Sequence, residues 1–541
     1  MIGKRNVYNL HEAGLGFLTV SRFSFRGTRS LFSSTMENKE IASVFKLVGQ
    51  IMELHGENKF KARSYANASF QIGRLSEPIR EMDPGAFEHI PGIGKNLVPK
   101  LLELVQTGQM TYLTDWLEKT PDGVLEILKI KGLGPSKVRL IWQEMGIESV
   151  GELLYACHEN RLIDLKGFGE KTQLQVQEAI EFMLQNRDRF LYASIEPLML
   201  EIKQWVGEHY PDALVSETGG MLRRDLIVES LEMVISEDVE SFPDTSMNKI
   251  DVHFHRVSKA SFEDEVFKRS GEGTVDEGLV PEMRNVPWAK EWKLQYSNEE
   301  LIADADLKGC LHNHSTYSDG MHSLEVMATH LRDLGYAYFG ICDHSKTAVY
   351  ANGLHADRIE QQHTEIESLN AQLGPFRILK GIESDILMDG SLDYEEDVLK
   401  SFDLIVASVH SVLKMDEATA TKRLITAVEN PYTKILGHPT GRLLLSRPGY
   451  PIDHKKVIDA CAANGVAVEL NANPMRLDID YTWIPYCMEK GVMVSINPDA
   501  HRKEGVDHMR YGVMAARKGG LVKEMTLNAL SLEDLLAWLQ R

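Results

Sequence analysis

The chain has 541 residues and is 43% hydrophobic, so it can bury several cores, and its length suggests three or four domains. Its formal net charge of -20 excludes broad electrostatic adhesion to nucleic acid, so any such contact has to be local and directed at the backbone. No apolar run approaches the length of a membrane span, and the five cysteines show no paired spacing. These features indicate a cytoplasmic protein with no membrane partner.

Residues 1–35 differ from the rest of the chain in composition. They are rich in Arg, Ser and Phe, and Glu12 is their only acidic residue. That composition resembles an organellar transit peptide. We favour a different interpretation, in which translation starts at Met36 and residues 1–35 are an unassigned extension.

Three short segments share a Gly-apolar-Gly pattern between apolar helical stretches, at residues 90–95, 130–135 and 165–170. Glycine lets the backbone approach a ligand closely, and the N–H groups of the next helix then point at it, which suits a phosphate. One such tripeptide is more often a plain turn, but three together resemble helix-hairpin-helix motifs, which hold DNA backbones without reading sequence. The predicted DNA-binding residues are Gly92, Gly94, Lys95, Gly132, Gly134, Gly167 and Gly169.

The C-terminal part alternates between two kinds of segment. Short apolar runs, often β-branched, occur at residues 336–341, 377–382, 404–409, 434–436, 466–470 and 492–496. Polar stretches compatible with helices, such as 323–334 and 356–373, separate them. This alternation predicts an α/β barrel or a close relative, and barrel enzymes place their chemistry at the carboxyl ends of the strands.

Nine potential metal ligands lie close to the ends of these runs, so we expect them to meet at one end of the barrel. They are His312, His314, Asp319, His344, Glu383, His410, His438, Asp499 and His501. Because side chains two residues apart on a strand share a face, His312 and His314 can grip one metal, as can Asp499 and His501. Imidazole and carboxylate together suit two or three divalent ions, such as Mn²⁺, Zn²⁺ or Fe²⁺.

Phosphoester hydrolysis is the reaction that such a site predicts. Metals held about 4 Å apart can generate hydroxide and clamp both oxygens of an in-line phosphoryl displacement. Glu383 is the candidate bridge between metals, and Glu383, Asp319 and His410 are the candidate catalytic residues. Any one of these histidines alone would more often be a hydrogen-bonded loop residue, but nine potential ligands at strand ends together favour a metal site.

In this order the motifs resemble the PHP (polymerase and histidinol phosphatase) domain. The resemblance implies a distorted (β/α)7 barrel, a trinuclear metal site and cleavage from a 3′ end. It also implies that Arg442, Asn471 and Asn473 contact the substrate phosphate or a metal-bound water. Ordinary turn and surface chemistry is the alternative for these three residues.

The basic segment at residues 58–68, which contains aromatic side chains, resembles the amino-terminal domain of family X DNA polymerases. In that family a lysine on the helix after the first hairpin forms a Schiff base with an abasic sugar, and Lys100 matches its position. An amine needs desolvation or cationic neighbours to become nucleophilic at neutral pH. A solvated helix lysine is the alternative.

After residue 190 the chain departs from the family X pattern. The resemblance implies an α+β nucleotidyltransferase-like palm, in which two aspartates at alternate positions of one strand and a third on a later strand hold two magnesium ions. Here the matching residues are Ser230, Glu232 and Asp251. Serine is neutral and glutamate is longer by one methylene, so the octahedral demands of magnesium are badly served. We predict a degenerate palm in which nucleotidyl transfer is lost or crippled.

The predicted architecture is therefore multidomain. It comprises the extension 1–35, a helical DNA-binding domain at 36–115, a second helix-hairpin-helix region at 116–190, the degenerate palm and linker at 191–305, and the PHP barrel at 306–541. We expect a monomeric, metal-dependent phosphodiesterase, a 3′–5′ exonuclease or end-processing repair nuclease, acting on gapped, abasic or 3′-end DNA. The alternatives are a small-molecule phosphatase of the histidinol-phosphatase type, a still active DNA polymerase, and a non-catalytic DNA-binding scaffold with structural metals.

Overall fold

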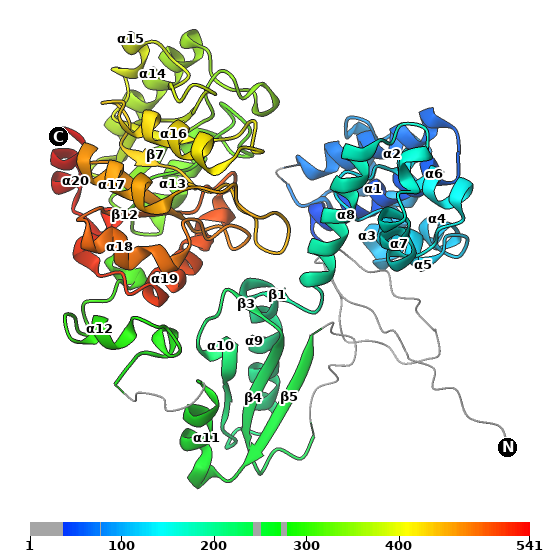
Figure 1. Cartoon of the computed structure of the whole chain (residues 1–541), viewed down its shortest axis with the longest axis horizontal. Coiled ribbons are helices and arrows are strands. Elements are labelled where there is room, and N and C mark those ends of the chain that lie inside the picture. Colours follow the sequence, from blue (N-terminus) through cyan, green and yellow to red (C-terminus); the bar gives the residue numbers. More distant parts are fainter. Residues whose placement is uncertain (1–35, 76, 242–249, 272–277) are drawn as a thin grey trace. The chain divides into compact units, whose positions relative to one another are not determined.

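The computed structural model describes residues 36–541 except 76, 242–249 and 272–277. The predictions made for residues 1–35 lie outside the described residues. The chain divides into two compact units, Met1–Arg187 and Asp188–Arg541, which are described separately (Figure 1). The finer division at residues 115, 190 and 305 stays a prediction.

The first unit is helical. Its helices are α1 (Asn38–Leu54), α2 (Lys59–Gly73), α3 (Val98–Thr107), α4 (Thr111–Leu117), α5 (Asp122–Ile127), α6 (Pro135–Met145), α7 (Val150–His158) and α8 (Glu170–Gln185). In α1 the buried residues Ile41, Phe45, Val48 and Met52 recur at the spacing that places them on one face. They pack with α2 to α4 around one core, while α5 to α8 surround a second core.

The second unit begins with a small sheet. Strand β4 (Ser230–Ser236) lies in the middle, antiparallel to β2 (Val215–Glu217) and parallel to β5 (Asp251–Val257), and β1 (Phe190–Leu191) pairs separately with β3 (Ile227–Val228). The helices of this region are α9 (Tyr192–His209), α10 (Gly219–Leu222), α11 (Phe262–Arg269) and α12 (Ala289–Lys293). The indole N–H of Trp292 on α12 donates to the carbonyl of Gly520 at 2.7 Å, which ties this connecting segment to the C-terminal part of the chain.

A seven-stranded parallel sheet forms the rest of the second unit. Its order follows the sequence: β6 (Gly309–Cys310), β7 (Tyr338–Ile341), β8 (Arg377–Asp385), β9 (Leu404–Ser408), β10 (Ile435–Leu436), β11 (Ala467–Asn471) and β12 (Val494–Asn497). The helices are α13 (Leu324–Asp333), α14 (Ala356–Leu373), α15 (Glu396–Leu399), α16 (Glu417–Val428), α17 (His454–Asn464), α18 (Ile484–Glu489), α19 (Met509–Lys518) and α20 (Leu532–Leu539). The predicted (β/α)7 barrel is confirmed, and β8 is longer than predicted, so Glu383 lies inside it.

The sheet closes between its first and last strands. Asn313, just after β6, forms a parallel bridge with Ala500, just after β12. At the opposite end the Asn528 side chain accepts from the Ile496 N–H at 2.6 Å and donates to the Gly309 carbonyl at 3.3 Å. The carboxyl ends of all seven strands therefore surround one mouth.

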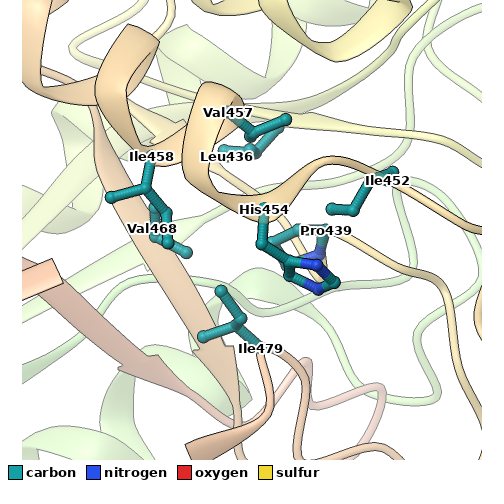
Figure 2. A pocket seen from close by; sticks show the side chains of 8 residues that line it. All are labelled: Leu436, Pro439, Ile452, His454, Val457, Ile458, Val468 and Ile479. Carbon is teal, nitrogen blue, oxygen red and sulfur yellow. The ribbon is translucent and has the colours of Figure 1, made fainter. Parts of the chain in front are cut away.

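Apolar side chains fill the barrel and the layer around it. Tyr338, Leu379 and Val406 of the barrel strands form one buried cluster with Leu535 and Trp538 of α20. Outside it, a small apolar hollow lies between α17 and strands β10 and β11 (Figure 2). His454 is the one titratable residue among those that line this hollow, so it is part of the packing and not a site for chemistry.

Among the residues that the structure describes, no helix is both long and apolar enough to cross a membrane.

Candidate metal centre

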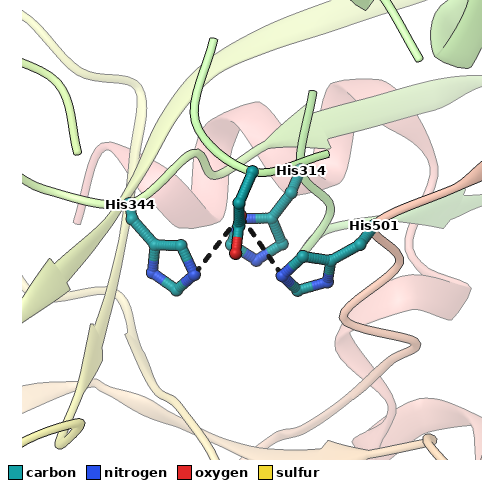
Figure 3. Close-up of side chains that lie close together, drawn as sticks. His314, His344 and His501 are labelled. Atoms are coloured by element: carbon teal, nitrogen blue, oxygen red, sulfur yellow. Dashed lines mark ion pairs between the residues drawn. The ribbon is translucent and has the colours of Figure 1, made fainter. Parts of the chain in front are cut away.

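All nine predicted ligands gather at the mouth of the barrel, where the loops after its strands meet. Among the described residues, three overlapping groups bring their ligand atoms within 4.8 Å of one another: His314, Asp319, His344 and His501; His312, His314 and Asp499; and His344, Glu383 and His410. Figure 3 shows the imidazoles of His314, His344 and His501, from three separate strand ends, pointing toward one another. The ninth residue, His438, joins the cluster through Glu383.

Glu383 lies at the centre of the cluster and is only 1% exposed. Its Oε1 lies 3.0 Å from His438 Nε2, 3.1 Å from His410 Nε2 and 3.4 Å from His312 Nε2. Its Oε2 faces a second set of imidazoles, at 2.9 Å from His344 Nδ1 and 3.7 Å from His314 Nε2. One carboxylate therefore faces five histidines, with a different group at each oxygen.

Several of these buried atoms have no hydrogen-bond partner among the residues that the structure describes. His344 Nδ1 and Glu383 Oε2 lie 2.9 Å apart, yet neither makes a hydrogen bond, and His312 Nε2 is also without one. A buried polar atom without a partner is costly, unless a ligand or ion supplies the partner. The donor set, of imidazole nitrogens and carboxylate oxygens, fits divalent transition metals.

The outer edge of the cluster includes Asp319, His501 and Asp499. Asp319 Oδ1 lies 3.4 Å from His501 Nε2 and 3.6 Å from His344 Nε2. Asp499 accepts a hydrogen bond from His314 Nε2 at 3.0 Å, and its backbone has a φ of 52°. This conformation is unusual for a residue other than glycine, and here it turns the Asp499 carboxylate back toward the cluster.

The charges in the cluster depend on one another. Burial alone would raise the pKa of Glu383, but His410, His312 and His344 hold it well below its usual value. Burial alone would lower the pKa of His410, yet Glu383 and Asp385 raise it to about 10. The pKa of His314 is instead lowered to about 3 by burial and by the neighbouring His501 and His344. Carboxylates are thus held ionised among imidazoles, which suits cation binding.

Two residues that sequence reasoning missed orient the histidines. Glu469 on β11 is fully buried; its Oε1 lies 2.7 Å from His312 Nδ1, and its Oε2 accepts from the His438 backbone N–H at 2.8 Å. Asp385 Oδ1 lies 2.5 Å from His410 Nδ1. Partners of this kind fix the tautomer and the ring direction of a metal-binding histidine. For Glu469 the available signal was a charged residue inside an otherwise apolar strand, but the strand that carries Asp385 contains other charged residues and gave no such signal.

Asp343, which precedes His344, was missed as well. Its carboxylate accepts from the backbone N–H groups of Ser315 and Ser318 at 2.8 and 3.1 Å, and from both of their hydroxyls. It is fully buried. These bonds hold the loop that carries His314 and Asp319.

The three predicted substrate residues have partners within the barrel. Arg442 donates to Asp480 and to the carbonyls of Arg476 and Leu477, so its guanidinium is engaged by its own loop. The Asn471 side chain donates to Asp499 Oδ2 at 3.2 Å, beside the cluster. Asn473 accepts from the N–H of Met475 and closes a turn. Their phosphate-binding role stays a prediction.

Arg476 provides a cation that sequence reasoning did not single out. Its Nε lies 3.9 Å from Asp499 Oδ2, and its side chain is 19% exposed. It therefore stands at the rim of the cluster.

In the first unit, the three glycine pairs form three similar hairpins. Gly92, Gly132 and Gly167 have φ values of 79°, 91° and 88°, which favour glycine. The second glycines precede helices, and their carbonyls accept the first helical hydrogen bonds, as Gly134 does from Lys137 at 2.9 Å. Gly94, Gly134 and Gly169 need no left-handed backbone, and a Cβ there would meet no atom within 4 Å.

Lys100 lies on α3 beside the first hairpin. Its Nζ donates to the Asn96 carbonyl at 3.0 Å and lies 5.0 Å from the centre of the Tyr112 ring. Lys61 and Lys95 line the same hollow of about 720 Å³. Three lysines thus face one concave surface.

The predicted palm residues lie on one face of the β4–β5 sheet. Ser230 and Asp251 are register partners, and so are Glu232 and His253. The Ser230 hydroxyl donates to Glu232 Oε1 at 2.9 Å, and Glu232 Oε2 lies 2.5 Å from His255 Nε2. Glu232 is therefore bound by neighbouring side chains.

Fold and site together define a class: multidomain proteins in which helix-hairpin-helix elements are joined to a PHP barrel. Residues 36–110 match the family described as a helix-hairpin-helix domain, and residues 124–181 match a SAM-like helix-hairpin-helix tandem. Over 94% of its length the chain is 32% identical to the whole of the DNA polymerase/3′-5′ exonuclease PolX of Bacillus subtilis (strain 168). It belongs to the PolX family, the family X polymerase-like proteins with a C-terminal PHP domain, so the predicted resemblance is confirmed.

Shorter relatives match the barrel. A probable phosphatase of Thermoanaerobacter sp. (strain X514) is 28% identical over 37% of this chain and 88% of its own length. A probable phosphatase of Caldanaerobacter subterraneus subsp. tengcongensis is 31% identical over 30% of this chain and 65% of its own length.

Proposed function

We propose that the protein is a metal-dependent phosphodiesterase that removes nucleotides from the 3′ ends of DNA. The observation that carries this proposal is the position of Glu383, whose two buried oxygens face different imidazoles within 3.7 Å. A carboxylate so placed can serve two metal ions at once. The relative from Bacillus subtilis, whose name includes a 3′-5′ exonuclease, supports the direction of cleavage.

The nine clustered residues would hold two or three divalent ions, for which Mn²⁺, Zn²⁺ and Fe²⁺ are the candidates. Such ions supply a nucleophile at neutral pH and neutralise charge on a phosphoryl group. Glu469 and Asp385 orient His312 and His410, which would hold the ions. Arg476, at the rim, is placed to pair with a phosphate of the substrate.

The helix-hairpin-helix unit would supply the DNA contact. Packing among the described residues does not require glycine at Gly94, Gly134 or Gly169, because a Cβ at each position would meet no atom within 4 Å. A bare backbone there suits a phosphate that approaches the start of the next helix. We propose that gapped, abasic or 3′-end DNA binds to a monomer in this way. The lyase role of Lys100 is tested separately, by borohydride trapping of an abasic oligonucleotide on the protein.

We further propose that nucleotidyl transfer is lost. Asp251 has a serine as its register partner, and the carboxylate of Glu232 is bound by Ser230 and His255. That arrangement offers magnesium a poor set of oxygen ligands. Nucleotide incorporation at a one-nucleotide gap tests this, and extension that Asp251→Ala abolishes would contradict it.

The test of the main proposal is hydrolysis of a 5′-labelled, gapped duplex by the full chain with Mn²⁺. We expect stepwise loss of 3′ nucleotides, which the His312→Ala/His314→Ala variant lacks. The control variant is His454→Ala, which removes a barrel histidine outside the cluster and should keep the activity. Equal rates for wild type and the double variant would overturn the proposal.

A second candidate is a phosphatase acting on small phosphomonoesters. It is favoured by the relatives named probable phosphatases, whose match is confined to about a third of this chain. Hydrolysis of p-nitrophenyl phosphate with no cleavage of DNA would select it. Duplex binding without any hydrolysis would instead select a scaffold with structural metals.

A further inference from the structure

Large apolar side chains are exposed around the mouth of the barrel. Within residues 309–541, all of which the structure describes, seven large hydrophobic side chains are exposed, and five of them lie in segments that follow the carboxyl ends of strands. These five are Val349, Tyr350, Met388, Val412 and Met475. A gathering of exposed apolar side chains marks a place where a ligand or partner binds. The metal centre lies at the same mouth, which makes the substrate the ligand to consider.

Tyr350 lies directly beside the metal centre. The centre of its ring is 6.1 Å from the centre of the His344 ring, with an angle of 57° between the two planes. Tyr350 is 72% exposed, and Val349 before it is 81% exposed. An uncovered aromatic ring next to a metal ligand can receive a flat group, such as a nucleobase, against its face.

The backbone that carries these two side chains is held by the barrel. Ala348 and Ala351, which flank the pair, are buried. The Leu354 N–H donates to the His344 carbonyl at 2.8 Å and closes the segment, while Asn352 turns the chain with a φ of 56°. The pair is therefore exposed on a fixed backbone, and a surface organised in advance loses little conformational entropy when a ligand binds.

Another segment of the mouth, after β11, presents an apolar side chain next to a cation. Met475 is 45% exposed; its N–H donates to Asn473 Oδ1 at 3.0 Å, and its carbonyl accepts from the Leu444 N–H at 2.7 Å. Arg476, the next residue, lies 3.9 Å from Asp499 at the rim of the cluster. Apolar surface and a cation at one mouth suit a nucleotide, which combines a flat base with a charged phosphate.

We propose that Tyr350 stacks on the base of the 3′-terminal nucleotide while the phosphate 5′ to that nucleotide lies at the metal centre. This role of Tyr350 rests on the proposed function, because the substrate is taken to be a DNA 3′ end. Stacking accepts every base, since each has a π-face, so nucleotides would be removed without regard to sequence. A base that stacks on the protein has to leave its own duplex, so an unpaired 3′ end is the preferred substrate.

Isothermal titration of the full chain with Mn²⁺ tests this with two small probes, dAMP and 2-deoxyribose 5-phosphate, which differ by the base. We expect the wild type to bind dAMP about tenfold more tightly, which is the contribution of one stacked base. Tyr350→Ala should bind both probes with the affinity that the wild type has for 2-deoxyribose 5-phosphate, which reports an intact metal centre. Tyr350→Phe keeps the ring and should retain the difference.

Leu334→Ala is the matched control. Leu334 is 50% exposed and belongs to the same barrel, but it lies at the end of α13, before β7, and so at the amino end of the strands. Its substitution should leave both affinities as in the wild type. Equal binding of the two probes by the wild type, or a preference for dAMP that Tyr350→Ala retains, would overturn the proposal. A wild type that prefers dAMP through Tyr350 but cleaves no DNA would support the stacking site and contradict the proposed function.

Discussion

Glu383 and Glu232 both lie on parallel strands with histidines facing them, but they differ in how they are enclosed. Glu383 is 1% exposed and faces five imidazoles, two of which are oriented by Glu469 and Asp385. Glu232 has a side chain that is 26% exposed, and two imidazoles and a serine surround it. The barrel closes on itself, whereas the palm-like sheet leaves one face to solvent.

The difference in enclosure separates what the two groups can do. A buried cluster with several ionised carboxylates strengthens the electrostatic interactions within it, and it can hold more than one metal for chemistry. On an open face with one carboxylate and two imidazoles, water weakens the electrostatic interactions. Substitutions at matched positions of the two groups should therefore have very different effects on hydrolysis.

The largest effect is expected for Glu383→Gln. Its amide would present an NH₂ group to imidazole nitrogens and remove the charge between the histidines, so DNA hydrolysis should fall by at least about 100-fold. Glu232→Gln should leave the hydrolysis rate unchanged. Single-turnover release of 3′ nucleotides measures both. Comparable losses in the two variants would show that the groups act together.

A smaller effect is expected when an orienting residue is changed. In Glu469→Gln one carboxylate oxygen becomes an NH₂ group, which cannot accept a hydrogen bond. Either the His438 N–H or the donors at the other oxygen therefore lose their acceptor. We expect metal affinity at the barrel to fall by about 10- to 100-fold. Isothermal titration with Mn²⁺ measures it. Glu489→Gln, an exposed glutamate beside Lys490, is the control, and an equal loss there would refute the orienting role.

The sequence predicts the barrel and the place of its cluster because both follow from local pattern. Apolar β-branched runs define strands, and polar residues after parallel strands must meet at one edge. Strand β6 is only two residues long and gave no apolar run, so His312 and His314 were found as a motif and not from a strand. The order of the motifs along the chain therefore indicated a strand before His312 that hydrophobic periodicity did not predict.

Contacts between distant segments could not be predicted in this way. Arg442 has the chemistry to bind a phosphate, yet its guanidinium donates to Asp480 and two backbone carbonyls, which only the folded loop brings close. Asn528 closes the barrel from a position 31 residues beyond Asn497, its partner at 3.2 Å. A side chain's partners depend on register and loop path, which local composition does not specify.

The hairpin glycines give a test that sharpens the contrast between binding and hydrolysis. In Gly134→Ala the added methyl group meets no atom of the described residues within 4 Å, so stability should be unchanged, but it should obstruct a phosphate at the start of α6. We expect DNA affinity to fall about tenfold, the cost of one charge-assisted hydrogen bond. Fluorescence anisotropy with a gapped duplex measures it, while hydrolysis of p-nitrophenyl phosphate should stay the same.

Gly151→Ala is the matched control for that variant. Gly151 lies in α7 of the same unit and also has open space beside it, but it is not part of a hairpin. Its substitution should leave DNA affinity unchanged. If both alanine variants bind as tightly as the wild type, the second glycines of the hairpins do not contact the backbone.

The smallest effect is expected at Glu282, a buried acid outside the metal cluster whose substitution should change stability and not hydrolysis. Its side chain is 4% exposed, with Arg517 Nε at 2.9 Å and Arg224 Nη1 at 3.1 Å. Burial alone would raise the pKa of Glu282, but the guanidinium groups of Arg517 and Arg224 hold it below its usual value. A lowered folded-state pKa stabilises the fold above the unfolded value, and this stabilisation is lost as pH falls through the folded value.

Glu282→Gln should therefore lower the free energy of unfolding near neutral pH and have progressively less effect as the pH falls below about 4. Urea unfolding of wild type and variant across that range measures the difference. Glu489→Gln again serves as the exposed control, since Glu489 is 67% exposed and should show little difference at any pH. A difference at Glu282 that stays constant with pH would mean that packing, and not charge, explains its contribution. Protonation of an exposed glutamate would change the free energy of unfolding little, so burial determines the effect of the charge at Glu282, as it does at Glu383.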